Sequence, residues 1–260
     1  MTGKQSLKNL KRKKRKSKLP RHYRILNFNS RQPFFISCEH ASHSIPKKYG
    51  FLGVKKKVIV KNPDYYDVGA EGIARILAEK FNARCVLSNH SRLLIDLNRG
   101  LNHPNLIPLS AFGMEIPFNR KNRKQRLKYY YPYHNRVKKE INELKKIHKR
   151  IYYFCIHSFS PDAKDGRNRK VDIGVLYRYK KDLTFCRKVK KLLEKKTKFL
   201  VRINEPYSAF ETAGLVMNSY GKSEKVRCIE FEINNKHLQN KKDIKKMGNL
   251  LCSVLREAIN

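Results

Sequence analysis

Ionisable side chains stand within or directly after three apolar runs of this sequence. Glu39 and His40 come after "FFISC", and His157 stands near the end of "YYFCIHS". The last run, "CIEFEIN", carries Glu230 and Glu232 two residues apart, which places both on one face of a strand. Because ligands of open α/β sheets bind beyond the carboxyl ends of the strands, we expect these groups to meet there.

Two histidines, a nearby carboxylate and a further carboxylate are the components of a hydrolytic zinc site. Imidazole and carboxylate groups bind Zn²⁺, one coordination position stays open for water, and the further glutamate accepts a proton. A nearby carboxylate stands in "PDYYDVGAEG", where Asp67 precedes a predicted helix. Each group also has a structural alternative, since Asp67 is well placed as a helix N-cap and a lone histidine is more often a hydrogen-bonded core residue. Ser158 beside His157 suggests nucleophilic catalysis, but no G-x-S-x-G motif surrounds it.

A second group of polar residues lies within the apolar stretch "SRLLIDLNR" at 91–99. Charges this close to an apolar run should be paired, because an isolated buried charge is costly. An arginine here could hold a substrate carboxylate through two hydrogen bonds, or it could form a structural pair with an aspartate. The turn "NEPYS" at 204–208 is a candidate pocket wall. The candidate substrate-binding residues are Arg92, Asp96, Asn98, Arg99, Ser158, Asn204 and Tyr207.

The spacing of apolar residues predicts an α/β domain in which strands alternate with helices around a mostly parallel or mixed sheet. Apolar runs predict strands at 34–38, 84–88, 151–157, 171–177, 199–203 and 226–233. Helical periodicity predicts helices at 70–81, 127–144, 181–196 and 239–259. We expect Pro132 to start, kink or break the second helix. The long connections 98–122 and 204–224 are expected to cover or wall the site.

The composition is strongly basic, with 60 Lys+Arg against 21 Asp+Glu and a formal net charge of +39. Residues 1–24 carry eleven Lys/Arg and no acid, which predicts a disordered basic arm before a single domain at 25–260. This charge favours contact with a polyanion such as RNA or an anionic surface, although many lysines fit solvated helix faces. The six cysteines form no C-x-x-C pair, and no signal peptide or membrane-spanning run is present, so we expect a cytoplasmic protein.

Several motifs occur in the order seen in one enzyme family. They are "SCEHASHSIP", "DVGAEGIARILAEKF", "SRLLIDLNR", "YPYHNRV", "IHSFSP", "IGVLY", "NEPYS" and "IEFEIN". Over roughly residues 33 to 257 the chain resembles the N-formylglutamate amidohydrolases. The resemblance implies a three-layer, phosphorylase/hydrolase-like α/β fold. It also implies a zinc-dependent reaction that hydrolyses N-formyl-L-glutamate to formate and glutamate.

The resemblance also assigns roles to individual residues. His40 and His157 resemble metal ligands, with Asp67 as the carboxylate ligand and Glu39 as its competitor. The general base would be a glutamate of the last strand, with Glu232 preferred and Glu230 behind it, and Arg92 or Arg99 would bind the substrate carboxylate. The sequence departs from the family pattern at His43 and Asn234, where many members carry Asn and Arg. Losing that arginine could change which acid the site accepts.

Three hypotheses follow for the function. The first is a zinc-dependent amidohydrolase acting on a small acidic N-acyl amino acid. The second is a polyanion-binding protein on an inherited hydrolase scaffold, which the basic arm and the net charge of +39 would support. The third keeps the amidase chemistry but takes a peptide or cell-wall amide as substrate.

Overall fold

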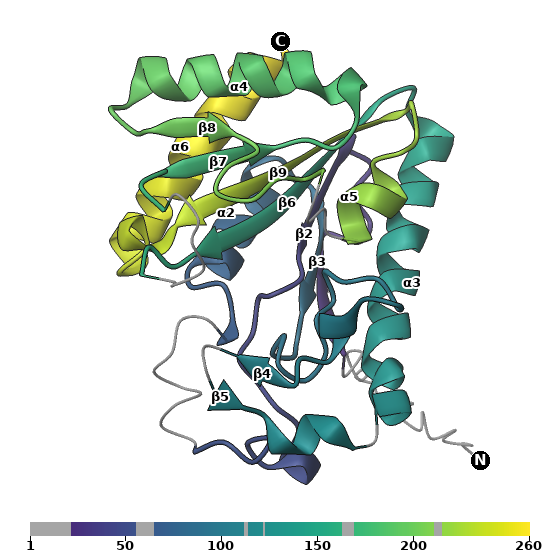
Figure 1. Cartoon of the computed structure of the whole chain (residues 1–260). Coiled ribbons are helices and arrows are strands. Elements are labelled where there is room, and N and C mark those ends of the chain that lie inside the picture. The colour runs from purple at the N-terminus through teal and green to yellow at the C-terminus, as the bar shows by residue number, and fades with distance from the viewer. Residues whose placement is uncertain (1–21, 56–64, 112–113, 122, 163–168, 211–214) are drawn as a thin grey trace, which may run out of the picture.

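A seven-stranded mixed sheet with helices on both faces forms the centre of the molecule (Figure 1). The computed structural model describes residues 22–55, 65–111, 114–121, 123–162, 169–210 and 215–260. The strand order is β1-β3-β2-β6-β9-β7-β8. The strands are β1 (Tyr23–Leu26), β2 (Phe34–Cys38), β3 (Arg84–Ser88), β6 (Ile151–Phe159), β7 (Ile173–Leu176), β8 (Val201–Ile203) and β9 (Val226–Asn234).

The centre of the sheet is parallel and its edges are not. Strands β3, β2, β6 and β9 run parallel to one another, β7 is antiparallel to β9, and β1 is antiparallel to β3. The predicted mixed α/β sheet is therefore confirmed. All six predicted strands are present, whereas the short edge strand β1 was missed because "YRIL" is only half-buried and follows a basic segment.

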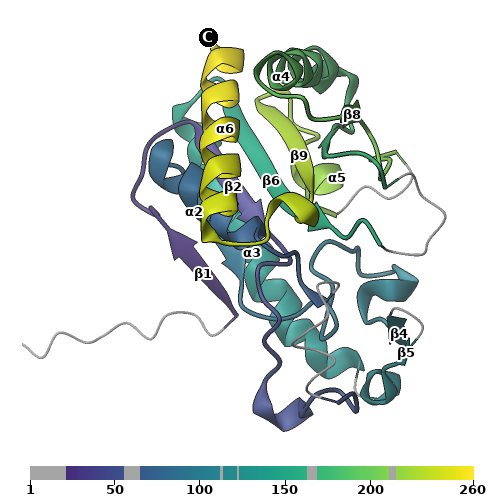
Figure 2. The same cartoon turned by 90° about the vertical axis from the view of Figure 1, so that its left-hand side faces the viewer.

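The helices divide into two layers. Helices α2, α4 and α6 pack on one face of the sheet, and α3 and α5 cover the other (Figures 1 and 2). The bounds are α2 (Ala70–Lys80), α3 (Arg123–Ile147), α4 (Leu183–Lys196), α5 (Leu215–Tyr220) and α6 (Lys241–Ile259). Shorter elements fill the connections: η1 (Lys47–Tyr49), η3 (Pro104–Leu106), β4 (Ser110–Ala111), β5 (Met114–Glu115), η4 (Pro117–Arg120), η5 (Lys180–Asp182) and η6 (Asn235–His237).

One row of side chains on the α3 side of the sheet leads to the polar residues. Phe35, Tyr153 and Cys228 are register neighbours on β2, β6 and β9 and belong to one apolar cluster. Because side chains alternate along a strand, residues an even number of positions later return to the same face. Four positions further along each chain stand Glu39, His157 and Glu232.

Pro132 was predicted to start, kink or break a helix, and it neither starts nor breaks one. Helix α3 begins at Arg123 and continues through Pro132 to Ile147. A proline in the helix interior removes one backbone hydrogen bond. Burial of the neighbouring side chains Tyr129 and Tyr133 outweighs that local cost, because they hold this part of the helix in the core.

The predictions of a basic arm and of a single domain concern segments that are only partly described. The basic arm predicted at 1–24 lies mostly outside the described residues, and Tyr23 and Arg24 already belong to β1. The arm, its polyanion contact and the single domain at 25–260 therefore stay predictions. Within the described part of the chain, no helix is both long enough and apolar enough to cross a membrane.

Candidate active site

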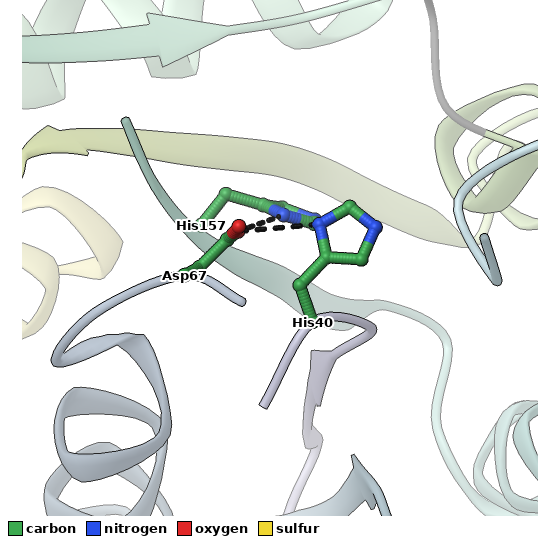
Figure 3. Close-up of side chains that lie close together, drawn as sticks. All are labelled: His40, Asp67 and His157. Carbon is green, nitrogen blue, oxygen red and sulfur yellow. Dashed lines mark hydrogen bonds and ion pairs between the residues drawn. The ribbon is translucent and has the colours of Figure 1, made fainter. Parts of the chain in front are cut away.

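Three ionisable side chains meet at the carboxyl edge of the sheet (Figure 3). His40 follows β2, His157 lies in β6, and Asp67 precedes α2. The Oδ2 atom of Asp67 lies 2.7 Å from Nδ1 of His157 and 3.3 Å from Nδ1 of His40. All three residues are buried, and one potential ligand atom from each lies within 4.8 Å of the others. This cluster could hold a metal ion.

Asp67 is held in place by the backbone around it. Its own N–H donates to the carbonyl of His40 at 3.0 Å, and the N–H of Ser158 donates to its Oδ2 at 3.3 Å. The N-cap of α2 is Gly69, with no side-chain cap. The alternative interpretation of Asp67 as an N-cap is therefore wrong, and its carboxylate is directed at the histidines instead (Figure 3).

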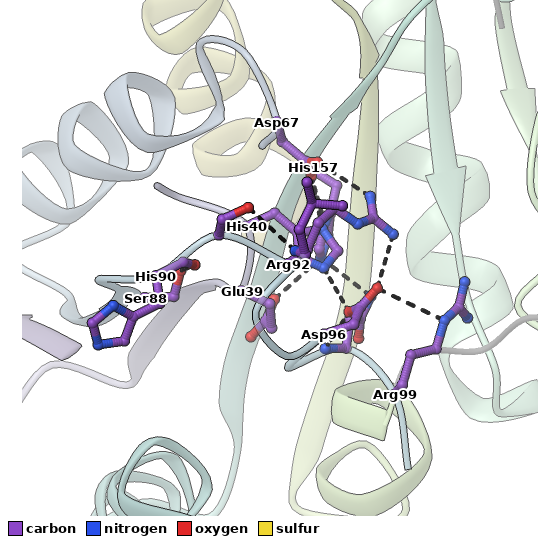
Figure 4. Close-up of polar contacts among 12 residues, drawn as sticks. Glu39, His40, Asp67, Ser88, His90, Arg92, Asp96, Arg99 and His157 are labelled. Atoms are coloured by element: carbon purple, nitrogen blue, oxygen red, sulfur yellow. Dashed lines mark hydrogen bonds and ion pairs between the residues drawn. The ribbon is translucent and has the colours of Figure 1, made fainter. Parts of the chain in front are cut away.

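A second carboxylate contacts the far nitrogen of each imidazole (Figure 4). His40 Nε2 lies 2.8 Å from Asp96 Oδ1, and His157 Nε2 lies 3.1 Å from Glu39 Oε2. Metal-binding histidines commonly donate their other N–H to a carboxylate, which fixes the tautomer and the ring orientation. With the Nε2 proton held by a carboxylate in this way, each imidazole could offer Nδ1 to a metal ion in place of the contact that Nδ1 makes with Asp67. Glu39 therefore contacts the far nitrogen of His157, whereas Asp67 belongs to the group of three residues that could hold a metal ion.

Glu39 is fixed by a residue that the sequence did not single out. The Tyr133 hydroxyl on α3 donates to Glu39 Oε1 at 2.8 Å. Burial raises the pKa of the Glu39 carboxyl, but hydrogen bonds with His157, Ser37 and Tyr133 outweigh burial and hold it below its usual value. Tyr133 stood in the motif "YPYHNRV", yet nothing in that motif distinguished it from the three tyrosines just before it.

The opposite situation holds for the two glutamates of β9. Glu230 and Glu232 are buried, and the Oε2 atom of each has no hydrogen-bond partner within the described residues. Burial, aided by the charges of Glu230 and Asp67 and opposed by that of His157, raises the pKa of Glu232 to about 8. The pKa of Glu230 is also raised, mainly by burial. Glu232 is the register neighbour of His157 on β6.

The donor set fits a divalent cation. Neutral imidazole nitrogens and a carboxylate are ligands that zinc accepts, and five carboxylates surround the two rings. Burial lowers the pKa of His157, but the nearby charge of Glu230 and the hydrogen bonds to Asp67 and Glu39 reverse this and raise it well above its usual value. The site therefore attracts positive charge, whether as a proton or as a metal ion.

The cluster opens into a cavity of about 220 Å³. Most of the residues predicted for metal or substrate binding line it together with both glutamates of β9. The lining residues are His40, Asp67, Arg92, Asn98, Arg99, His157, Ser158, Tyr207, Glu230 and Glu232. Glu39, Asp96 and Asn204 were predicted for the site, and they support it from behind rather than line the cavity.

Asp96 connects His40 to the two arginines (Figure 4). Arg92 Nη2 donates to Asp96 Oδ2 at 3.0 Å, and its Nη1 lies 3.7 Å from Asp67 Oδ1. Arg99 Nε lies 3.9 Å from Asp96 Oδ2. The structural pair of Arg92 with Asp96 is therefore present. Arg92 also lines the cavity, and its binding of a substrate carboxylate stays a prediction.

The remaining predicted substrate residues have different surroundings. The amide nitrogen of Asn98 lies 3.4 Å from His157 Nε2. The Ser158 hydroxyl donates to the carbonyl of Val68 at 2.8 Å, so it secures the turn that carries Asp67. Asn204 accepts from the N–H of Tyr177 at 3.0 Å and thereby holds the turn that carries Tyr207. Asn204 has a positional role in the structure, whereas Asn98 lines the cavity.

Comparison with known proteins decides the family. The sequence pattern of the N-formylglutamate amidohydrolases matches residues 32–238. This chain belongs to the N-formylglutamate amidohydrolase family. Its membership confirms the resemblance of the ordered motifs and makes the protein an amidohydrolase. No curated protein matches this chain in sequence.

Two solved structures share the fold of the amidohydrolase. The gene product Atu2144 from Agrobacterium tumefaciens is 28% identical, with a TM-score of 0.83, over 92% of this chain and 95% of that one. An N-formylglutamate amidohydrolase from Ralstonia eutropha is 16% identical, with a TM-score of 0.67, over 92% of this chain and 98% of that one. The second likeness shows the shared fold.

A glycine opposite Glu232 allows the turn with Tyr207 to approach the site. Gly174 on β7 is the register neighbour of Glu232. A Cβ atom at this position would lie 2.2 Å from the carbonyl oxygen of Glu205 and 3.2 Å from the Cβ of Glu232. The backbone of Glu205 therefore occupies the space that any side chain at position 174 would need.

We expect Gly174→Ala to displace this turn. Unfolding free energy should fall by about 1–3 kcal/mol because a backbone atom must move, and kcat/KM for amide hydrolysis should fall roughly 10-fold or more because Tyr207 shifts. Chemical denaturation and steady-state kinetics measure both quantities. Gly100→Ala is the matched control, since no atom lies within 4 Å of its added Cβ. Equal behaviour of the two variants would contradict the close-approach role.

Proposed function

We propose that this amidohydrolase is metal-dependent and hydrolyses the amide bond of a small acidic N-acyl amino acid resembling N-formylglutamate, releasing formate and glutamate. The observation that carries the proposal is the buried Nδ1–carboxylate–Nδ1 set of His40, Asp67 and His157. Unpaired carboxylate oxygens of Glu230 and Glu232, judged within the described residues, belong to the same cavity wall. Membership of the family supports the reaction class.

Zn²⁺ is the metal that this donor set fits best. His40 and His157 would bind it through Nδ1, and Asp67 would bind it through Oδ2. When bound, the ion would polarise the amide carbonyl and lower the pKa of a water molecule. Asp96 and Glu39 hold the two imidazoles in the required orientation through Nε2.

Glu232 would act as the general base. Its raised pKa of about 8 lies close to neutral pH, where a carboxyl group can both accept and release a proton. Its Oε2 atom has no partner within the described residues, so it can take a proton from water and pass it to the leaving nitrogen. Glu230 stands two residues deeper in β9, and its charge helps to raise the proton affinity of Glu232.

Arg92 and Arg99 would bind the distal carboxylate of the substrate. Both line the cavity, and Asp96 holds both guanidinium groups on one side. Because a guanidinium carries five N–H donors, pairing with Asp96 leaves donors for a substrate carboxylate. A cavity of about 220 Å³ suits a small molecule, and a peptide or cell-wall amide would extend beyond it.

The purified protein should contain about one zinc ion per chain and should hydrolyse N-formyl-L-glutamate. Elemental analysis measures the metal, and formate release measures the reaction before and after chelation. Activity should disappear with the metal and return with added zinc. N-formyl-L-glutamine is the matched substrate control, because it lacks the distal charge and should react more slowly. A metal-free protein with no hydrolysis, and none after zinc addition, would sink the proposal.

The two competing carboxylate ligands can be separated by substitution. Asp67→Asn should lose the metal, because it replaces a charged ligand between the two histidines. Glu39→Gln should keep the metal with roughly 10- to 100-fold lower affinity, because only the orientation of His157 is affected. Metal titration of each chelated variant measures both effects. The reverse order would make Glu39 the ligand.

Substitution of the two β9 glutamates tests the assignment of the base. Glu232→Gln should lower kcat by roughly 10²-fold or more while keeping the metal, because it removes the proton acceptor. Glu230→Gln should cost less, because Glu230 acts on Glu232 through its charge. Kinetics and elemental analysis on the same preparations give both values. A larger loss of kcat in Glu230→Gln would transfer the role of base to Glu230.

A further inference from the structure

Tyr207, which lines the cavity, is paired with an arginine that is not among the lining residues described. Arg169 lies four residues before β7, and Tyr207 lies in the turn after β8. Nη1 of Arg169 donates to the Tyr207 hydroxyl at 2.7 Å and to the carbonyl of Ser160 at 3.2 Å. Tyr207 also lines the cavity with Glu232. No local sequence pattern connects the two members of the pair, because they are 38 positions apart.

Aromatic contacts restrict the position of the pair further. The guanidinium carbon of Arg169 lies 5.1 Å from the ring centroid of Tyr207 and 5.6 Å from that of Phe159. The rings of Phe159 and Tyr207 are perpendicular, with centroids 6.3 Å apart. A cation within about 6 Å of a ring centroid is attracted by the ring. Arg169 therefore restricts both the hydroxyl and the ring plane of Tyr207.

The backbone of Arg169 is attached to the strand that carries Glu232. The side chain of Asn234, two residues beyond Glu232 on β9, is fully buried. Its amide nitrogen donates to the carbonyl of Arg169 at 3.3 Å and to that of Val171 at 3.1 Å. The backbone of Arg169 is therefore held at a fixed position relative to Glu232. Tyr207, which Arg169 contacts, is held in the same way.

The chemistry of the pair excludes Arg169 as the acceptor of the phenol proton. A guanidinium only donates, so the Tyr207 oxygen accepts from Arg169 and its own proton is directed at another acceptor. Burial and the charge of Glu232 raise the pKa of Tyr207 to about 12, so the phenol keeps its proton at neutral pH. Donation by a charged group to the phenol oxygen also strengthens the phenol as a donor.

We propose that Arg169 is a positioning residue that fixes the Tyr207 hydroxyl as a hydrogen-bond donor to an oxygen atom of the substrate. This inference rests on the proposed amide hydrolysis. Arg169 has no place in the cavity lining among the described residues, so it acts on the reaction through Tyr207. Removing the hydroxyl should therefore remove the effect of Arg169 on catalysis.

A double-mutant cycle tests this dependence. With N-formyl-L-glutamate and zinc-loaded enzyme, Tyr207→Phe should lower kcat/KM roughly 10-fold, and Arg169→Met should cause most of the same loss. The double variant should be no worse than Tyr207→Phe alone. Arg169→Lys, which keeps a donor for the phenol oxygen, should recover part of the activity. Binding of L-glutamate by the same proteins, measured by calorimetry, should follow the same non-additive pattern.

Arg178→Met serves as the matched control. Arg178 donates to the carbonyl of Phe210 at 3.0 Å, so it anchors the same segment without contacting the Tyr207 hydroxyl. Its effect should be equal with and without the Tyr207→Phe substitution, and thermal melts should show every variant folded. The inference is overturned if Arg169→Met behaves like wild type, or if its loss of kcat/KM multiplies with that of Tyr207→Phe. The proposed function would stand in both cases. A wild-type enzyme without hydrolysis overturns the proposed function together with the inference.

Discussion

The contact of one buried carboxylate with two imidazoles determines how the carboxyl edge of this sheet is built. Asp67 joins the end of β2, the end of β6 and the turn before α2, because its oxygen faces both His40 and His157. Burial would raise the pKa of Asp67, but the charge of His40 and the hydrogen bond with His157 hold it well below its usual value. A buried negative charge is stable only when it is paired, so the surrounding groups must supply positive charge.

The carboxylates around this contact have the same chemistry but opposite environments. Glu39 accepts hydrogen bonds from Tyr133 and His157, which stabilise its ionised form. Glu232 is buried with an oxygen that lacks a partner within the described residues, which favours its protonated form. Environments that push the pKa values of similar groups apart assign different roles to them. Glu39 and Glu232 flank His157 in the row across β2, β6 and β9. Glu39 is therefore suited to orienting the imidazole of His157, and Glu232 is suited to transferring a proton.

Much of the fold and of the candidate site could be predicted from local sequence patterns. The buried strands are continuous apolar runs, so β2, β6 and β9 were found together with the polar residues that end them. The edge strand β1 and the uninterrupted path of α3 through Pro132 depend on tertiary contacts that no local pattern encodes. The same limit applies inside the site. The cluster of His40, Asp67 and His157 followed from motif order, whereas the supports from Tyr133 and Arg169 join distant positions.

The separation between strand ends and connecting segments has a consequence for how such an enzyme can change. His40, His157 and Glu232 stand at the ends of β2, β6 and β9, and Asp67 precedes α2. Arg92, Arg99 and Tyr207 come from other connections outside the strands. Replacing the connection 98–122 or the turn after β8 would alter the shape and charge of the cavity wall without moving a proposed metal ligand. The proposed metal ligands would therefore stay in place while the segments that contact the substrate are exchanged.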